Sequence, residues 1–180
     1  MKRLIQTTML LGLLAILPAG CTSSYSAPLE IEDVRSVLEH NIRLIEAGIN
    51  GEDVFLASQP ISEQFTMDNN VAVRYSSEWT GEGVGSFRNF WAKVFEDNAN
   101  IQFELVMVGL ELDGDIATAH CTSDYTSQMP DIVPPEVRVA TDNDYLQFER
   151  QNGEWLLRRW EFRPDPEPDD GHDEGEGGTV

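Results

Sequence analysis

The sequence contains little cysteine and little basic charge, and each shortage excludes a class of protein. Two cysteines in 180 residues, Cys21 and Cys121, cannot form a disulfide framework, and no Cys or His residues are spaced like zinc ligands, so we expect no metal site. Twelve Lys and Arg residues stand against 32 Asp and Glu residues, which gives a formal net charge of -20. Because such a field repels phosphate groups, the composition argues against nucleic acid or an anionic lipid surface as a partner.

Motifs for familiar catalytic chemistry are also missing. The sequence shows no Ser-His-Asp arrangement and no glycine-rich phosphate loop, so we expect no cofactor. Cys121 lies between Ala119 and Ser123 in an expected strand. We interpret it as a small buried hydrophobic residue rather than a nucleophile.

The N-terminal segment, residues 1–20, has the pattern of a secretion signal. Lys2 and Arg3 precede an apolar run over residues 9–17, and this run is too short for a stable membrane span. We therefore expect the chain to be exported.

The end of this leader, Leu-Pro-Ala-Gly-Cys at residues 17–21, resembles a bacterial lipobox. The resemblance implies cleavage before Cys21 and lipidation of its sulfur, so that the membrane is contacted through the N-terminal lipid alone. Pro18 departs from the usual aliphatic residue, which leaves ordinary signal cleavage as an alternative. Thr22 after the cysteine favours a cell-envelope lipoprotein of the outer membrane that faces the periplasm.

The remaining chain has room for one domain with a hydrophobic core. Residues 21–28 form a short polar linker, and residues 29–164 carry the apolar patterns of a folded domain. Residues 165–180 hold seven acids, no base and no apolar run, so we expect a disordered acidic tail.

Hydrophobic periodicity predicts helices first and strands afterwards. The expected helices cover residues 29–50, 52–58 and 86–97, the last capped by Ser86; two short strands cover 61–67 and 71–75; four long strands cover 101–110, 116–128, 137–150 and 155–163. This order predicts an α+β fold in which three N-terminal helices pack on a curved antiparallel sheet.

Several short stretches resemble the nuclear transport factor 2-like, SnoaL-like superfamily, whose cystatin-like fold is a cone-shaped α+β half-barrel. They are LIEAG at 44–48, GSFRNFW at 85–91, GDIA at 114–117, LQF at 146–148 and GEWLLRRWEF at 153–162. The resemblance covers about residues 29–163 and implies the fold. It implies no single activity, because the superfamily includes isomerases, cyclases, dehydratases, transport factors and binding modules. A homodimer through the open sheet face is common among relatives and is a further alternative here.

Ketosteroid isomerases of this superfamily combine an aspartate base with an oxyanion hole. The resemblance places Asp68 where the base would stand and Asp144 on a later strand, while Asn41 lies near the position of the tyrosine donor. His120 offers another polar group on a strand. The alternative interpretation is structural: Asp68 starts a turn, Asp144 solvates a strand edge, and His120 is an ordinary strand residue.

Aromatic residues suggest a ligand pocket inside the cone. Strict alternation along the last strand would put Arg158, Trp160 and Phe162 on one face, and Trp91 lies on the aromatic face of the third helix. Together with Asn41 they would form a mostly apolar pocket with one cation, which suits a small hydrophobic or amphipathic ligand, including one that bears a carboxylate. The aromatic face of the third helix is interpreted first as core, and a cavity wall is the secondary interpretation.

The sequence therefore favours an exported, lipid-anchored module that binds a small ligand or another protein. The alternative is a cofactor-free isomerase, cyclase or hydratase that uses Asp68 with Asp144 or His120.

Overall fold

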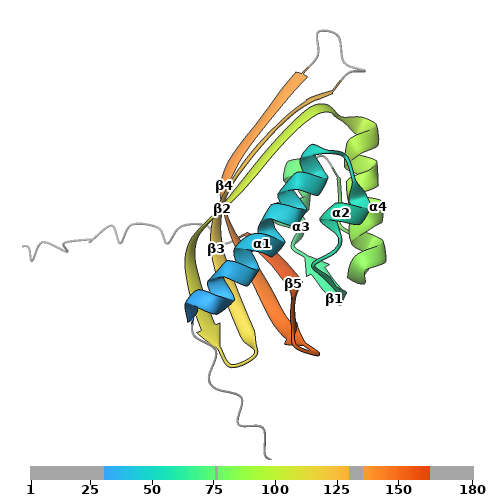
Figure 1. The fold of residues 1–180 in the computed structure, drawn as a ribbon. Helices are drawn as coiled ribbons and strands as arrows, with labels where there is room; N and C mark the ends of the chain where they lie inside the picture. Colours follow the sequence, from blue (N-terminus) through green and yellow to red (C-terminus); the bar gives the residue numbers. More distant parts are fainter. Residues whose placement is uncertain (1–30, 76, 130–135, 163–180) are drawn as a thin grey trace, which may run out of the picture.

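The fold is defined by a computed structural model that describes residues 31–75, 77–129 and 136–162 (Figure 1). The expected leader, the lipidation site Cys21, the linker and the acidic tail lie outside these residues.

The longest helix, α1 (Ile31–Asn50), follows the apolar periodicity of the sequence. Its buried positions recur every three or four residues: Val34, Leu38, Ile42, Ile45 and Ile49. Ile31 and Val37 belong to the same apolar stripe, but they are 45% and 44% exposed. The N-terminal half of α1 thus shows apolar surface that the rest of the domain does not cover.

The remaining elements are α2 (Val54–Ala57), β1 (Ile61–Met67), α3 (Asn69–Ala72), the 3-10 helix η1 (Val73–Tyr75), α4 (Gly83–Asp97), β2 (Ala99–Asp113), β3 (Ile116–Met129), β4 (Glu136–Gln151) and β5 (Glu154–Phe162). One sheet contains all five strands in the order β1-β5-β4-β3-β2. The helices gather on one side of this curved, open sheet (Figure 1). None of these helices is both long and apolar enough to span a bilayer.

This architecture confirms the expected α+β fold. The expectation of a wholly antiparallel sheet is wrong at one edge, because β1 pairs with β5 in parallel. The other neighbours are antiparallel, and the β2–β3 and β4–β5 connections are hairpins. Gly114 and the Asn152-Gly153 pair adopt the positive φ angles that these turns require.

Residues 71–75 are helical, so the short strand expected there is wrong. The cause is Asp68, whose carboxylate accepts a hydrogen bond from the Asn70 N–H at 2.9 Å and caps α3 directly after β1. The expected cap at Ser86 is also wrong, because α4 already begins at Gly83. Gly83 has φ +80, and an added Cβ would lie 2.4 Å from the carbonyl oxygen of Glu63.

Aromatic rings fill the space between the helices and the concave face of the sheet. Tyr75 and Trp91 from the helical side meet Phe103, Tyr125 and Trp160 from the strands, and all five are buried. The ring centroids of Tyr75 lie 5.0 Å from Trp91 and 4.8 Å from Tyr125. The interior of the cone is therefore packed as core, with edge-to-face and tilted contacts between neighbouring rings.

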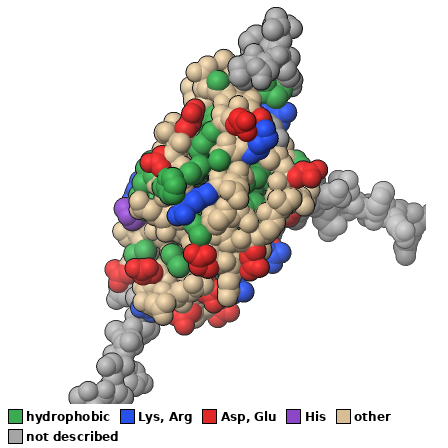
Figure 2. All heavy atoms as spheres, turned by 90° about the vertical axis from the view of Figure 1, so that its right-hand side faces the viewer, with side chains coloured by type: hydrophobic (Ala, Val, Ile, Leu, Met, Phe, Trp, Pro, Cys, Tyr) green, Lys and Arg blue, Asp and Glu red, His purple; other side chains and the backbone are tan. Residues whose placement is uncertain are grey.

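The outer surface on the side of α4 mixes hydrophobic, acidic and basic side chains (Figure 2). Phe55, at the start of α2, is largely exposed, and the Arg88 guanidinium lies over its ring at 5.0 Å from the centroid. Arg88 also donates a hydrogen bond to the Ser58 hydroxyl at 2.7 Å. These contacts hold α2 against α4. Among the described residues, the face that Figure 2 shows has no large patch made of one kind of side chain.

Candidate functional site

A charged cluster lies at the edge of the aromatic interior. Asp144, on the inner face of β4, is fully buried and accepts a hydrogen bond from Arg74 Nη2 at its Oδ1, at 2.5 Å. Arg74 lies in η1, and its Nη1 also pairs with Asp142 Oδ2 at 2.9 Å. We call Arg74, Asp142 and Asp144 the Arg74 cluster. Its guanidinium lies over the ring of Phe162, which is half-buried at the end of β5.

Burial and charge shift the proton equilibria of this region in a consistent direction. Burial raises the pKa of Tyr75 well above its usual value, and the negative charge of Asp144 raises it further. Burial alone would lower the pKa of Arg74, but Tyr75, Asp144 and Asp142 outweigh it, so the pKa is raised. At neutral pH the interior therefore holds a neutral phenol beside a permanent guanidinium ion.

Five buried polar atoms of the interior and its edge have no hydrogen-bond partner among the described residues. They are Arg74 Nε, Asp144 Oδ2, Trp91 Nε1, Tyr125 Oη and Trp160 Nε1. Buried groups without partners are uncommon and need an explanation, such as a bound water or a ligand group. The interior thus includes a free carboxylate oxygen, a free phenol hydroxyl and the free N–H donors of two indoles, with the Arg74 Nε–H at its edge.

Asp68 and His120 do not join this cluster. The carboxylate of Asp68 caps α3, and its backbone N–H donates to the Trp160 carbonyl at 2.9 Å. His120 lies on the outer face of β3, because its neighbour Cys121 is the buried residue that pairs with Asp144. The structure therefore places the three expected catalytic residues in three separate settings.

Among the expected pocket residues, Arg158 does not lie on the face of β5 on which it was expected. The register of β5 against β4 shifts between Gln147 and Phe148, so Arg158 is the extra residue of a β-bulge. Trp160 points into the core, whereas Arg158 Nη1 pairs with Glu149 Oε2 at 2.8 Å on the outer face. The shared face expected from strict alternation is wrong for this pair, because one extra residue inverts the pattern.

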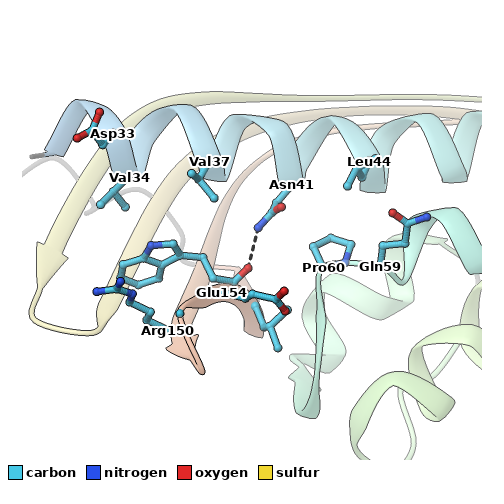
Figure 3. A pocket seen from close by; sticks show the side chains of 12 residues that line it. Asp33, Val34, Val37, Asn41, Leu44, Gln59, Pro60, Arg150 and Glu154 are labelled. Carbon is cyan, nitrogen blue, oxygen red and sulfur yellow. Dashed lines mark hydrogen bonds between the residues drawn. The ribbon is translucent and has the colours of Figure 1, made fainter. Parts of the chain in front are cut away.

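Outside the filled interior, a groove separates α1 from the β4–β5 hairpin (Figure 3). We call it the base groove; its volume is about 430 Å³. This volume is within the range of about 300–1,000 Å³ that is typical of small-molecule sites. Its apolar lining comes mainly from Val34, Val37, Leu44, Pro60, Trp155 and Leu156.

Five polar side chains complete the base groove: Asp33, Asn41, Gln59, Arg150 and Glu154. Asn41 Nδ2 donates to the Trp155 carbonyl at 2.7 Å and crosses from α1 to the hairpin, as the dashed line in Figure 3 shows. Asn41 was expected in a pocket, and the structure places it in this one. Asp33 and Glu154 are exposed, whereas Arg150 is half-buried.

Arg150 was not singled out from the sequence. Within the described residues, its side chain forms no ion pair and no hydrogen bond, although seven other salt bridges of Arg and Lys are present there. An arginine just before the Asn152-Gly153 turn resembles any strand-end arginine, so no signal in the sequence marked it. The described residues contain no group of three or more His, Cys, Asp or Glu placed to hold a metal ion.

Comparison with known proteins shows similarity in structure only. No family model matches the sequence, and no curated protein matches it. A protein from Kribbella flavida superposes with a TM-score of 0.65 at 12% identity, over 76% of this chain and 94% of that one. A nuclear transport factor 2-like superfamily protein from Salmonella enterica gives 0.61 at 13% identity, over 79% and 99%.

A candidate scytalone dehydratase from Novosphingobium aromaticivorans superposes with a TM-score of 0.58 at 8% identity, over 72% of this chain and 83% of that one. These three similarities show the nuclear transport factor 2-like fold that the sequence motifs indicated. At such low identities they carry the fold and no activity.

Proposed function

We propose that this protein is a non-catalytic binding module that holds a small amphipathic molecule in the base groove. One observation carries the proposal: the interior of the cone is filled with aromatic rings, while the base groove is open, largely apolar and contains the unpaired Arg150. Apolar walls with a few polar groups are the usual composition of small-molecule sites.

The positions of the acidic residues support a binding role over general base catalysis. A general base needs a free carboxylate within reach of a substrate proton. Asp68 is occupied as a helix cap, and Asp144 is held by Arg74 behind the rings of the interior. Neither residue lines the base groove.

The same proposal includes export and lipid anchoring through Cys21, on the strength of Lys2, Arg3 and the lipobox-like residues 17–21. The domain would then work at a membrane surface while its acidic body stays in solution. Replacing Cys21→Ser should abolish incorporation of labelled palmitate in the host. Continued labelling of that variant would contradict lipidation at this residue.

The binding role can be tested by identifying what the protein carries. We expect mass spectrometry of protein purified from its host to detect a small amphipathic molecule in the wild type. The variant Val37→Trp fills the groove and should lose it, whereas Val73→Trp, at another exposed valine outside the groove, should retain it. A ligand that survives Val37→Trp, or a wild-type protein without any ligand, contradicts the proposal.

A second function, cofactor-free proton transfer, is favoured by the unpartnered Asp144 Oδ2 in an apolar setting. If the interior opens, this oxygen could accept a proton next to a substrate carbonyl, and the indole N–H groups could stabilise the resulting oxyanion. Wild-type protein would then catalyse deuterium exchange into ketone substrates, and Asp144→Asn would not. Equal exchange rates for both proteins would refute this function.

A homodimer through the outer sheet face is also proposed. Val137 and Val139 on β4 are exposed there, on the face opposite the core. Light scattering of the protein without its leader should then give twice the monomer mass, and Val139→Glu should halve it. A monomer mass for the unmodified protein would contradict the dimer.

A further inference from the structure

The base groove combines one cation with an apolar wall, and this pairing specifies a ligand class. Arg150 lies at the hairpin end of the groove, and Val37 and Leu44 project from α1 above the hairpin (Figure 3). The guanidinium of Arg150 has no ion-pair partner within the described part of the chain, as shown above. A half-buried guanidinium without a partner has lost part of its hydration and gained no compensating contact.

From this geometry we infer that the base groove binds amphipathic monocarboxylates, with the carboxylate on Arg150 and the apolar chain along Val37, Leu44 and Pro60. The inference depends on the proposed binding role of the groove and names the chemistry of its ligand. Guanidinium and carboxylate match in shape and charge, and such a pair forms two parallel hydrogen bonds.

The two acidic residues of the groove set a limit on the charge of the ligand. Asp33 and Glu154 are exposed, so water screens them more than it screens the half-buried Arg150. One carboxylate can therefore gain from Arg150, while a second carboxylate would lie at the Leu44 and Pro60 end, where no basic side chain among the described residues lines the groove and the field of the groove is negative (Figure 3). The groove should select monocarboxylates over dicarboxylates of the same length.

The net charge of -20 does not prevent binding of an anion at this site. At about 0.15 M salt the Debye length is about 8 Å, so acids farther than this from Arg150 contribute little there. The local contact decides the affinity. Lower salt should weaken binding, because the repulsion of the whole protein then reaches the groove.

The test is calorimetric titration of the full mature chain with decanoate, decanol and the dicarboxylate sebacate at physiological salt. We expect decanoate to bind more tightly than either of the other two. Arg150→Gln should weaken decanoate binding about ten-fold, as expected for one charged hydrogen-bonded contact, and leave decanol unchanged. Arg150→Lys should recover part of the loss, and Arg43→Gln, at an exposed arginine of α1 outside the groove, should have no effect.

Two outcomes separate failure of this inference from failure of the binding role. If decanol binds as tightly as decanoate, Arg150→Gln changes neither, and Val37→Trp abolishes both, then the ligand class is wrong and the groove still binds. If Val37→Trp leaves the binding of every probe unchanged, or no probe binds, the groove is not the site and both proposals fail. Unfolding curves of Arg150→Gln should match the wild type, because the Arg150 side chain has no hydrogen-bond partner within the described residues and the substitution keeps the backbone bond from its N–H to the Asp115 carbonyl.

Discussion

Removal of Arg74 tests whether the interior is closed in solution as it is in the structure. The variant Arg74→Met keeps a long side chain and deletes the charge that neutralises Asp144. Asp144 has 0% side-chain exposure and Arg74 has 12%, so water cannot take over the role of the guanidinium. Breaking a buried pair by removing one partner costs about 3–5 kcal/mol, because the remaining charge stays buried without compensation.

Variants at Asp142 and Asp144 provide internal controls for this loss of stability. Asp142 is 27% exposed, so Asp142→Asn breaks a pair that water already screens and should cost about 1 kcal/mol or less. The double variant Arg74→Met/Asp144→Leu replaces both charges by apolar groups. It should recover most of the loss seen in Arg74→Met, because no uncompensated charge remains.

Urea unfolding at neutral pH, followed by tryptophan fluorescence and by circular dichroism, measures all three free energies. Since small domains have about 5–15 kcal/mol of stability, Arg74→Met should lower the midpoint drastically or prevent folding, while the double variant folds. A loss below about 1 kcal/mol in Arg74→Met would show that solvent reaches Asp144. The interior would then be open, and the case for proton transfer would gain at the expense of the binding role.

Three further predictions concern the framework of the fold. Gly48→Ala should destabilise the protein by about 1–3 kcal/mol in urea unfolding, because the new Cβ would lie 2.2 Å from the backbone nitrogen of Ala57. An unchanged free energy of unfolding would contradict this close packing. Asn50→Ala should lower the free energy of unfolding by about 1–3 kcal/mol in the same assay, since the Asn50 amide both donates to and accepts from the backbone of Phe103 at 2.7 Å. Unchanged stability would mean that water replaces both hydrogen bonds. Burial raises the pKa of the Cys121 thiol far above its usual range. Above about pH 8.5 the unfolded chain therefore loses a proton that the folded state keeps. The free energy of unfolding should then fall by about 1.4 kcal/mol per pH unit. The difference in stability between wild type and Cys121→Ala should therefore shrink by about 2 kcal/mol from pH 8.5 to 10, and a constant difference would refute the burial of this thiol.

Elements whose sequence pattern is local and regular were predictable. The apolar period of α1 and the Asp113-Gly114 and Asn152-Gly153 turns are examples, because each is determined by residues a few positions apart. The inward position of Trp160 is different, because alternation from the buried Trp155 and Leu157 would point it outward and the bulge at Arg158 turns it inward. The structure confirms the α+β class because these local signals agree with the global fold.

The features that failed depend on contacts between distant segments. The bulge at Arg158 arises where β5 must pair with β4 on one side and with β1 on the other, and both registers shift there. Residues 71–75 are apolar enough for a strand, but the cap at Asp68 turns the chain into a helix. Neither the bulge nor the helix cap produces a periodic pattern in the sequence. Strict alternation along β5 therefore predicts the wrong face for Arg158.

The base groove was not predictable for the same reason, and its origin lies in how α1 is fastened. Near its C-terminal end, the Asn50 amide bonds to both backbone groups of Phe103, so the helix covers the free edge of β2 there. At the middle of α1, the Asn41 amide bonds to the Trp155 carbonyl, and among the described residues no side chain of residues 31–40 forms a hydrogen bond to the sheet. The N-terminal half of α1 buries Val34 and Leu38 but leaves Val37 exposed over the hairpin, and this is the apolar surface that the proposed ligand would cover.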